Sequence, residues 1–275
     1  MFCSSISMLP LSLGLIFLFS LPHEAKAENP VSQENKKIES IYHIEPWTDG
    51  GIIALGVGIT IFAYADSENL IHVTCPCNPS DVNSFDRAVI GNKNDGLEHI
   101  SDLTAAAASV FPAVLDYFDV GLSKEFAEDM TVYAEVISVN NALVTIAKYE
   151  IQRPLPRTYD GDPNLVQSPG GYRSFYSGHT SLTFAALSAA AMTRSLRHEG
   201  EWWPWVLTGV VGTSVAYERV EAGRHFYTDV LVGAAIGTTL GILIPKWHHD
   251  QKFKDQTIGF MPIAGGAAAL WRFNF

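Results

Sequence analysis

The chain has 275 residues, of which 47% are hydrophobic, and 29 acidic side chains against 18 basic ones give it a formal net charge of −11. A nucleic-acid partner is not expected, because no basic stripe is present to neutralise phosphates along a strand. The charged fraction of 17% lies below the roughly 25% of soluble domains, between an ordinary soluble protein and a polytopic membrane protein.

The first 27 residues have the pattern of a secretory signal peptide. An apolar stretch covers residues 10–21, and Ala25 and Ala27 supply the small side chains of a cleavage site. No Lys or Arg precedes the apolar stretch, so an uncleaved anchor is the alternative. Residues 28–45 are polar and predict a loose N-terminal arm. The protein is therefore expected to be exported, to a bacterial periplasm or a cell-envelope membrane.

Residues 46–250 are expected to form one helical domain. It begins with an uncharged apolar run at residues 50–65, about the length of a short membrane span. A long polar loop follows, in which Cys75 and Cys77 are so close that a bridge between them is strained; we interpret them as a local loop feature or reactive thiols. Apolar side chains at helical spacing predict further helices at residues 103–122, 130–149, 180–196, 202–217 and 225–247. Each is either a buried bundle helix or a marginal membrane helix.

The tail, residues 251–275, has a different pattern. Residues 257–264 and 267–275 flank a Gly-Gly pair, which predicts a short β-hairpin. The predicted fold class is therefore all-α, a helical bundle of about five to six helices with a short C-terminal β-hairpin or ribbon.

A histidine and two charged residues mark the start of the last predicted helix. His225 and Asp229 are four positions apart, so on a helix they share one face. A carboxylate there can accept the proton of one imidazole nitrogen, which leaves the other nitrogen free to attack. Arg219, six residues before His225, can present its planar fork to a phosphate.

A second group lies where another helix begins. Ser177 is a good N-cap residue, and the helical pattern starts directly after it. The N–H groups of a helix N-terminus bind anions, and Gly178 allows a close approach to that backbone. His179 stands at the same end, where it can protonate a leaving oxygen.

A third group supplies positive charge. Lys148 lies at the end of a predicted helix, and Arg153 and Arg157 follow in a stretch broken by prolines. Phosphoryl transfer needs cations around the equatorial oxygens, an in-line nucleophile and an acid for the leaving group. The three groups offer a candidate for each of these roles, and the scheme needs no metal.

These segments resemble the signature of the type-2 phosphatidic acid phosphatase and vanadium haloperoxidase superfamily, K-x6-R-P, P-S-G-H and S-R-x5-H-x3-D, over residues 148–229. The resemblance implies an α-helical bundle without a required metal. It implies His225 as nucleophile, Asp229 as the residue that orients it, and His179 as general acid. It implies a phosphate site made of Lys148, Ser177, Gly178 and Arg219.

The chain departs from this signature at three positions. Leu155 stands where the first motif has its arginine, and Arg153 and Arg157 flank it, so either can supply the missing charge. Tyr176 replaces the proline of the second motif, and Glu218 replaces the serine of the third.

The predicted function is a metal-independent phosphatase that hydrolyses a phosphomonoester or pyrophosphate through a phosphohistidine. The apolar helices favour a phosphorylated lipid and contact with a membrane, and a small soluble phosphate ester is the other substrate class. Three alternatives are a vanadium-dependent haloperoxidase, a metal hydrolase with His179, His225 and Asp229 as ligands, and an inactive membrane or scaffold relative. No cofactor is expected; vanadate would be an inhibitor or, in the first alternative, the cofactor.

Overall fold

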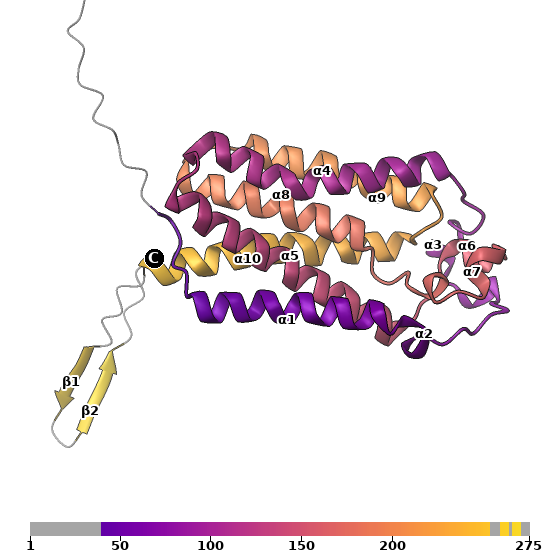
Figure 1. The fold of residues 1–275 in the computed structure, drawn as a ribbon, viewed down its shortest axis with the longest axis horizontal. Helices are drawn as coiled ribbons and strands as arrows, with labels where there is room; N and C mark the ends of the chain where they lie inside the picture. The colour runs from indigo at the N-terminus through magenta and orange to yellow at the C-terminus, as the bar shows by residue number, and fades with distance from the viewer. Residues whose placement is uncertain (1–39, 254–258, 264–265, 271–275) are drawn as a thin grey trace, which may run out of the picture. The chain divides into compact units, whose positions relative to one another are not determined.

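The computed structural model describes residues 40–253, 259–263 and 266–270 (Figure 1). The predicted signal peptide at residues 1–27, and residues 28–39 of the predicted arm, lie outside this part of the chain. Six helices of 19 residues or more dominate it: α1 (Pro46–Ala65), α4 (Asp95–Val120), α5 (Lys124–Ile151), α8 (Gly178–Arg197), α9 (Trp203–Glu221) and α10 (Tyr227–Phe253). All six segments that the sequence predicts to be helical thus form helices.

Short elements fill the connections between these helices. They are α2 (Ser67–Leu70), α3 (Ser84–Arg87), α6 (Pro156–Tyr159), α7 (Pro163–Val166) and the 3₁₀ helices η1 (Pro79–Asp81) and η2 (Pro169–Tyr172). The strands β1 (Gly259–Ile263) and β2 (Gly266–Leu270) pair antiparallel with each other.

The predicted fold class needs a correction. The described residues form ten α-helices rather than five to six, because α2, α3, α6 and α7, of four residues each, lie in stretches too short to show helical periodicity. Residues 40–253 contain no strand, and β1 and β2 pair with nothing but each other. The fold is therefore an all-α bundle, and a β-hairpin or ribbon is not a component of it.

Helix α8 lies at the centre of the bundle and packs most extensively against α10 (Figure 1). Its buried face consists largely of alanines, and α10 turns glycines towards it. A Cβ atom at Gly233 would lie 2.8 Å from the carbonyl oxygen of Ser177, and one at Gly241 would lie 2.5 Å from that of Ala185. The two backbones therefore approach each other closely between Gly233 and Gly241 of α10.

Polar caps set where the long helices begin. The side chains of Asn94, Ser123 and Ser177 accept hydrogen bonds from the first-turn N–H groups of α4, α5 and α8. After the C-terminal end of α9, Gly223 follows the C-cap residue Ala222 and has φ +65°, the left-handed conformation that glycine adopts without a Cβ clash.

Four helical segments are long and apolar enough to cross a membrane: Pro46–Ala65, Asp95–Val120, Lys124–Tyr159 and Tyr227–Lys252. Between 17% and 50% of the most apolar 18-residue stretch of each segment is buried inside the bundle, and other apolar side chains face outwards. Leu55 of α1 and Phe118 of α4 are 66% and 79% exposed, for example. Such surface is expected of helices that contact lipid.

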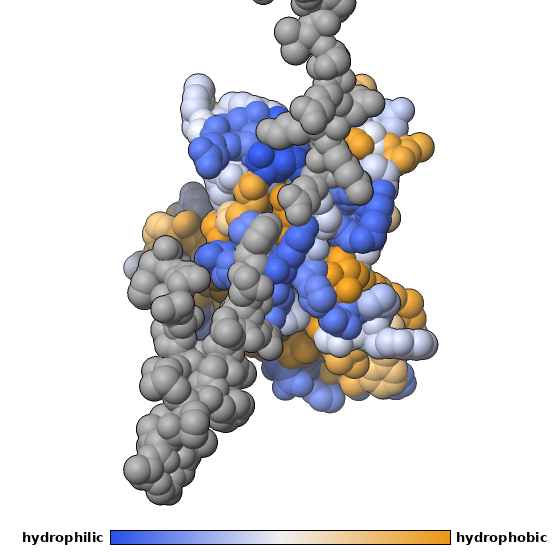
Figure 2. Space-filling model, turned by 90° about the vertical axis from the view of Figure 1, so that its left-hand side faces the viewer, coloured by the Kyte–Doolittle hydropathy of each residue, from blue (hydrophilic) through white to orange (hydrophobic). Residues whose placement is uncertain are grey.

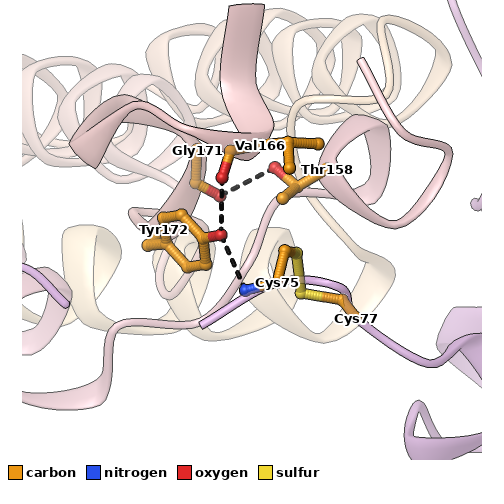
Figure 3. Close-up of a disulfide and its surroundings, with 6 residues drawn as sticks. All are labelled: Cys75, Cys77, Thr158, Val166, Gly171 and Tyr172. Carbon is orange, nitrogen blue, oxygen red and sulfur yellow. Dashed lines mark hydrogen bonds between the residues drawn. A yellow bond between two sulfur atoms is a disulfide. The ribbon is translucent and has the colours of Figure 1, made fainter. Parts of the chain in front are cut away.

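Cys75 and Cys77 form a disulfide in the loop between α2 and η1 (Figure 3). The sequence interpretation, a local loop feature or reactive thiols, did not include this bond. The N–H of Cys75 donates to the Tyr172 hydroxyl at 3.0 Å, and this hydroxyl donates to the Val166 carbonyl at 2.9 Å. The loop is thereby fixed to the segment that precedes Arg173.

Candidate functional site

A cavity of about 130 Å³ lies where α5 and α9 end and α8 and α10 begin. It corresponds to roughly four times the ≈30 Å³ that one water molecule occupies in the liquid, enough for a tetrahedral oxyanion. Cationic and histidine side chains dominate its lining, which consists of Tyr64, Lys148, Leu155, Gly170, Arg173, His179, Arg219, Arg224 and His225.

The structure brings His225 and His179 to the same cavity. His225 does not lie on the helix with Asp229 as predicted, because Gly223 ends α9 in a turn and α10 begins only at Tyr227. In this turn the N–H of His225 donates to the Arg219 carbonyl at 3.3 Å. The nucleophile candidate is therefore held by the connection between two helices.

The tautomer of His225 follows from its neighbours. Its Nδ1 lies 2.8 Å from the carbonyl oxygen of Ser174, which can only accept, so Nδ1 carries the proton and Nε2 has a free lone pair. Asp229 Oδ2 is 3.8 Å from Nδ1, within electrostatic reach but beyond hydrogen-bonding distance. Burial lowers the pKa of His225 to about 4; the cations Arg219 and Lys148 act in the same sense and Asp229 opposes them.

Asp229 is fully buried behind the histidine. It accepts hydrogen bonds from the N–H of Phe226 at 2.9 Å, from the Ser174 hydroxyl at 2.5 Å and from Arg153 Nη1 at 2.6 Å. Its carboxylate thus fixes both the turn that carries His225 and the residue whose carbonyl holds the ring.

The two arginines that flank Leu155 do not line the cavity. Arg153 bonds to Asp229 and, through Nη2, to Asp86 at 2.8 Å. Burial alone would raise the pKa of Asp86, but hydrogen bonds from Arg153, Thr228 and Asn83 outweigh it and hold that pKa below its usual value. Arg153 therefore stabilises Asp229 and does not contact the cavity.

Arg157 also forms its interactions outside the cavity. It is buried, donates to the Ala222 carbonyl at 2.7 Å and pairs with Asp95 at 2.8 Å. The cavity instead contains Arg173 and Arg224, which sequence reasoning did not select. The available signal was their position, since one stands four residues before Ser177 and the other directly precedes His225.

Asp102 of α4 is a second residue that the motifs do not include. Its Oδ1 lies 2.9 Å from His179 Nε2 and 3.1 Å from Arg219 Nη1, so one carboxylate oxygen contacts both groups. Burial, followed by the positive charge of Arg219, by repulsion from His225 when that ring is protonated and by the positive charge of Lys148, lowers the pKa of His179. The carboxylate of Asp102 acts against this shift.

The remaining site residues lie around the start of α8. Ser177 caps the helix, and its hydroxyl bonds to that of Thr180 at 2.9 Å. A Cβ atom at Gly178 would lie 3.6 Å from Lys148 Nζ, so the ammonium group lies next to the helix N-terminus. The N–H groups of this first turn have no intrahelical acceptor and, with Lys148 and Arg219, suit an anion.

The three residues that the metal-hydrolase alternative requires do not form a metal site. Among the described residues, His179, His225 and Asp229 do not bring three ligand atoms within 4.8 Å of one another, whereas a different group of three residues does. The cavity has the donors for a phosphate or vanadate oxyanion instead.

Comparisons with known proteins agree with this site. A family model described as the PAP2 superfamily matches residues 129–253, a range that includes Lys148, His179, Arg219, His225 and Asp229. Phospholipid phosphatase 1 of Rattus norvegicus is 28% identical over 169 residues, 49% of this chain and 60% of that protein.

Two proteins of Porphyromonas gingivalis are also similar. Lipid A 1-phosphatase is 24% identical over 258 residues, 89% of this chain and 52% of that protein. Lipid A 4'-phosphatase is 34% identical over 77 residues, 28% of this chain and 30% of that protein. The chain spans 60% or less of the length of these relatives.

The resemblance drawn from the three sequence motifs is thus confirmed by an independent match over the segment that carries them. Residues 129–253 of this chain, which carry the three motifs, belong to the PAP2 superfamily.

Proposed function

We propose that this protein is a phosphatase that removes a phosphate group from a phosphorylated lipid through a phosphohistidine on His225. The observation that carries the proposal is the small cavity in which Lys148, Arg173, Arg219 and Arg224 surround two histidines. The relatives named as phospholipid and lipid A phosphatases support the same reaction class.

In the first step of the proposed reaction, the Nε2 lone pair of His225 attacks phosphorus. The N–P bond forms as the bond to the leaving oxygen breaks, and His179 gives that oxygen its proton. Lys148, Arg219 and the first-turn N–H groups of α8 hold the non-bridging oxygens while negative charge builds up on them. The low pKa of His225 keeps its lone pair available above about pH 4.

In the second step water replaces His225 on phosphorus. His179, now neutral, takes a proton from the water molecule as its oxygen attacks, and inorganic phosphate and free His225 are released. Every proton is moved by a histidine, and the charge is neutralised by side chains. The scheme therefore requires no metal and no cofactor.

The lipid substrate is proposed from the surface of the bundle. The four segments that can cross a membrane present apolar side chains such as Leu55 and Phe118 outwards. The Cys75–Cys77 disulfide supports a position outside the reducing cytoplasm, as the predicted signal peptide does. We place the protein in a bacterial cell-envelope membrane with its cavity on the exported side.

The decisive experiment is a substrate panel, with phosphatidate, a lipid pyrophosphate and p-nitrophenyl phosphate offered to the wild type and to His225→Ala. We expect lipid phosphates to turn over fastest and His225→Ala to lose at least about a thousandfold in kcat. His72→Ala, a change at an exposed histidine outside the cavity, is the matched control and should behave as wild type.

Two results would contradict the proposal. Equal turnover by the wild type and His225→Ala would show that no phosphohistidine forms on His225. No turnover by either protein would indicate an inactive relative. Vanadate should inhibit; vanadate-dependent oxidation of bromide in its place would identify a haloperoxidase.

A further inference from the structure

A second group of titratable side chains lies far from the phosphate cavity. Asp49 of α1, Glu135 of α5 and His248 of α10 each offer one ligand atom, and these atoms all lie within 4.8 Å of one another. His248 is 19 positions after Asp229 on α10, which at 1.5 Å per residue puts it roughly 28 Å along the helix from the candidate active site. The proposed reaction uses none of the three residues.

The burial and charge of this group need an explanation. Asp49, Glu135 and His248 are only 1%, 3% and 2% exposed. Among the described residues no Lys or Arg forms an ion pair with either carboxylate, and Glu135 pairs with His248 alone, at 2.9 Å. Glu135 thus pairs with the imidazole, whereas the Asp49 carboxylate accepts the backbone N–H of Glu45, and two acidic groups lie with a single imidazole in a place where charge is costly.

The imidazole is oriented in the way that metal-binding histidines are. His248 Nδ1 lies 2.8 Å from the carbonyl oxygen of His43, which accepts its proton, and Nε2 shares a second proton with Glu135 Oε2 at 2.9 Å; a cation that displaces this second proton meets the Nε2 lone pair. The N–H of His43 donates in return to the His248 carbonyl at 3.2 Å. The ring is therefore held at the tautomer and angle that a cation requires.

The carboxylates have free ligand capacity beside an open space. Asp49 Oδ2 accepts the N–H of Glu45 at 2.8 Å, and no described group bonds to Oδ1. Asp49 and His248 line a cavity of about 350 Å³, which gives an ion an entry route and room for bound water. Figure 2 faces this end of the bundle, where α1 begins and α10 ends, and shows hydrophilic residues gathered between apolar ones.

We propose that Asp49, Glu135 and His248 bind one divalent transition-metal cation of the Zn²⁺ class. One imidazole nitrogen and two carboxylate oxygens, completed by water, form a common ligand set for zinc, and bonds of about 2.0–2.2 Å put tetrahedral ligand atoms about 3.3–3.6 Å apart. The three ligand atoms lie within 4.8 Å of one another, so side-chain adjustment must bring them to this spacing. The ion replaces the proton shared by Glu135 and His248, neutralises the buried charge and joins α1, α5 and α10.

The test uses the full chain, purified in detergent and stripped with EDTA. After Zn²⁺ is added and excess is removed, we expect about one zinc per chain by mass spectrometry and a melting temperature several degrees higher. Glu135→Gln, which keeps the shape of the side chain, should lose at least about tenfold in zinc affinity together with the rise in melting temperature. His248→Ala should lose both, whereas His249→Ala, a change next to the group, should keep both.

Three results would overturn the proposal: a wild type without stoichiometric zinc, Glu135→Gln with unchanged zinc affinity, or Mg²⁺ bound in preference to Zn²⁺. Glu135→Gln decides the matter even if His248→Ala does not fold. Phosphatase turnover is a separate readout. Glu135→Gln should retain it, so a failure of the metal site and a failure of the proposed reaction can be told apart.

Discussion

Asp102 holds one oxygen between the predicted general acid and the predicted phosphate-binding arginine. In the proposed reaction His179 must carry a proton when the leaving oxygen departs, and burial and neighbouring cations lower its pKa. A carboxylate 2.9 Å away stabilises the protonated ring and therefore raises that pKa. Asp102 is a positioning residue whose charge sets the pH at which the acid functions.

The substitution Asp102→Asn keeps the shape of this side chain and removes its charge. Since the pKa of His179 then falls further, we expect the alkaline limb of the kcat/KM profile to move down by about one pH unit or more. The pH–rate profile of a soluble ester measures this directly. A reduced rate with an unmoved limb would mean that Asp102 only holds Arg219 in place.

Arg173 lines the cavity together with Leu155, the residue that stands where the motif has its arginine. We expect Arg173→Ala to lower kcat/KM by about 10²–10³, the cost of one group that stabilises transition-state charge. Leu155→Arg alone should not reduce turnover, and in the Arg173→Ala background it should restore part of the loss. No restoration would show that the two positions do not serve the same phosphate oxygens.

Several helices of the bundle are joined by a buried ionic network centred on Arg197 at the end of α8. Its Nη2 pairs with Asp129 of α5 at 2.6 Å, and its Nη1 pairs with Asp116 and Asp119 of α4 at 3.0 and 3.4 Å. Asp116 and Asp129 are 3% and 1% exposed, so water does not screen them. This network fixes the end of α8 opposite His179.

Replacing Arg197 with Met leaves these carboxylates without their shared cation. We expect the free energy of unfolding to fall by about 3–5 kcal/mol, as when one partner of a buried pair is removed. Lys124→Met, which removes the exposed cation of an i,i+4 pair with Glu128, should cost less than about 1 kcal/mol. Denaturant unfolding of both variants measures the difference, and equal losses would contradict the assigned role.

At the scale of the whole molecule, helical periodicity was sufficient to predict the six long helices, and motif spacing was sufficient to select His179 and His225. The sequence could not show that Arg153 and Arg157 turn away, because their partners, Asp86 and Asp95, belong to segments more than fifty residues earlier. Asp102 was missed for the same reason. The disulfide and the short helices depend on tertiary contacts that no local pattern contains.

The direct contact between the backbones of α8 and α10 determines how the bundle responds to changes in membrane thickness. Flexible side chains adjust when a membrane becomes thinner or thicker, but two main chains in contact, as at Gly233 and Gly241, cannot slide without a clash. The helix that begins beside the acid and the helix that begins beside the nucleophile therefore move as one rigid body. The spacing between the two imidazoles is thereby insulated from changes in membrane thickness.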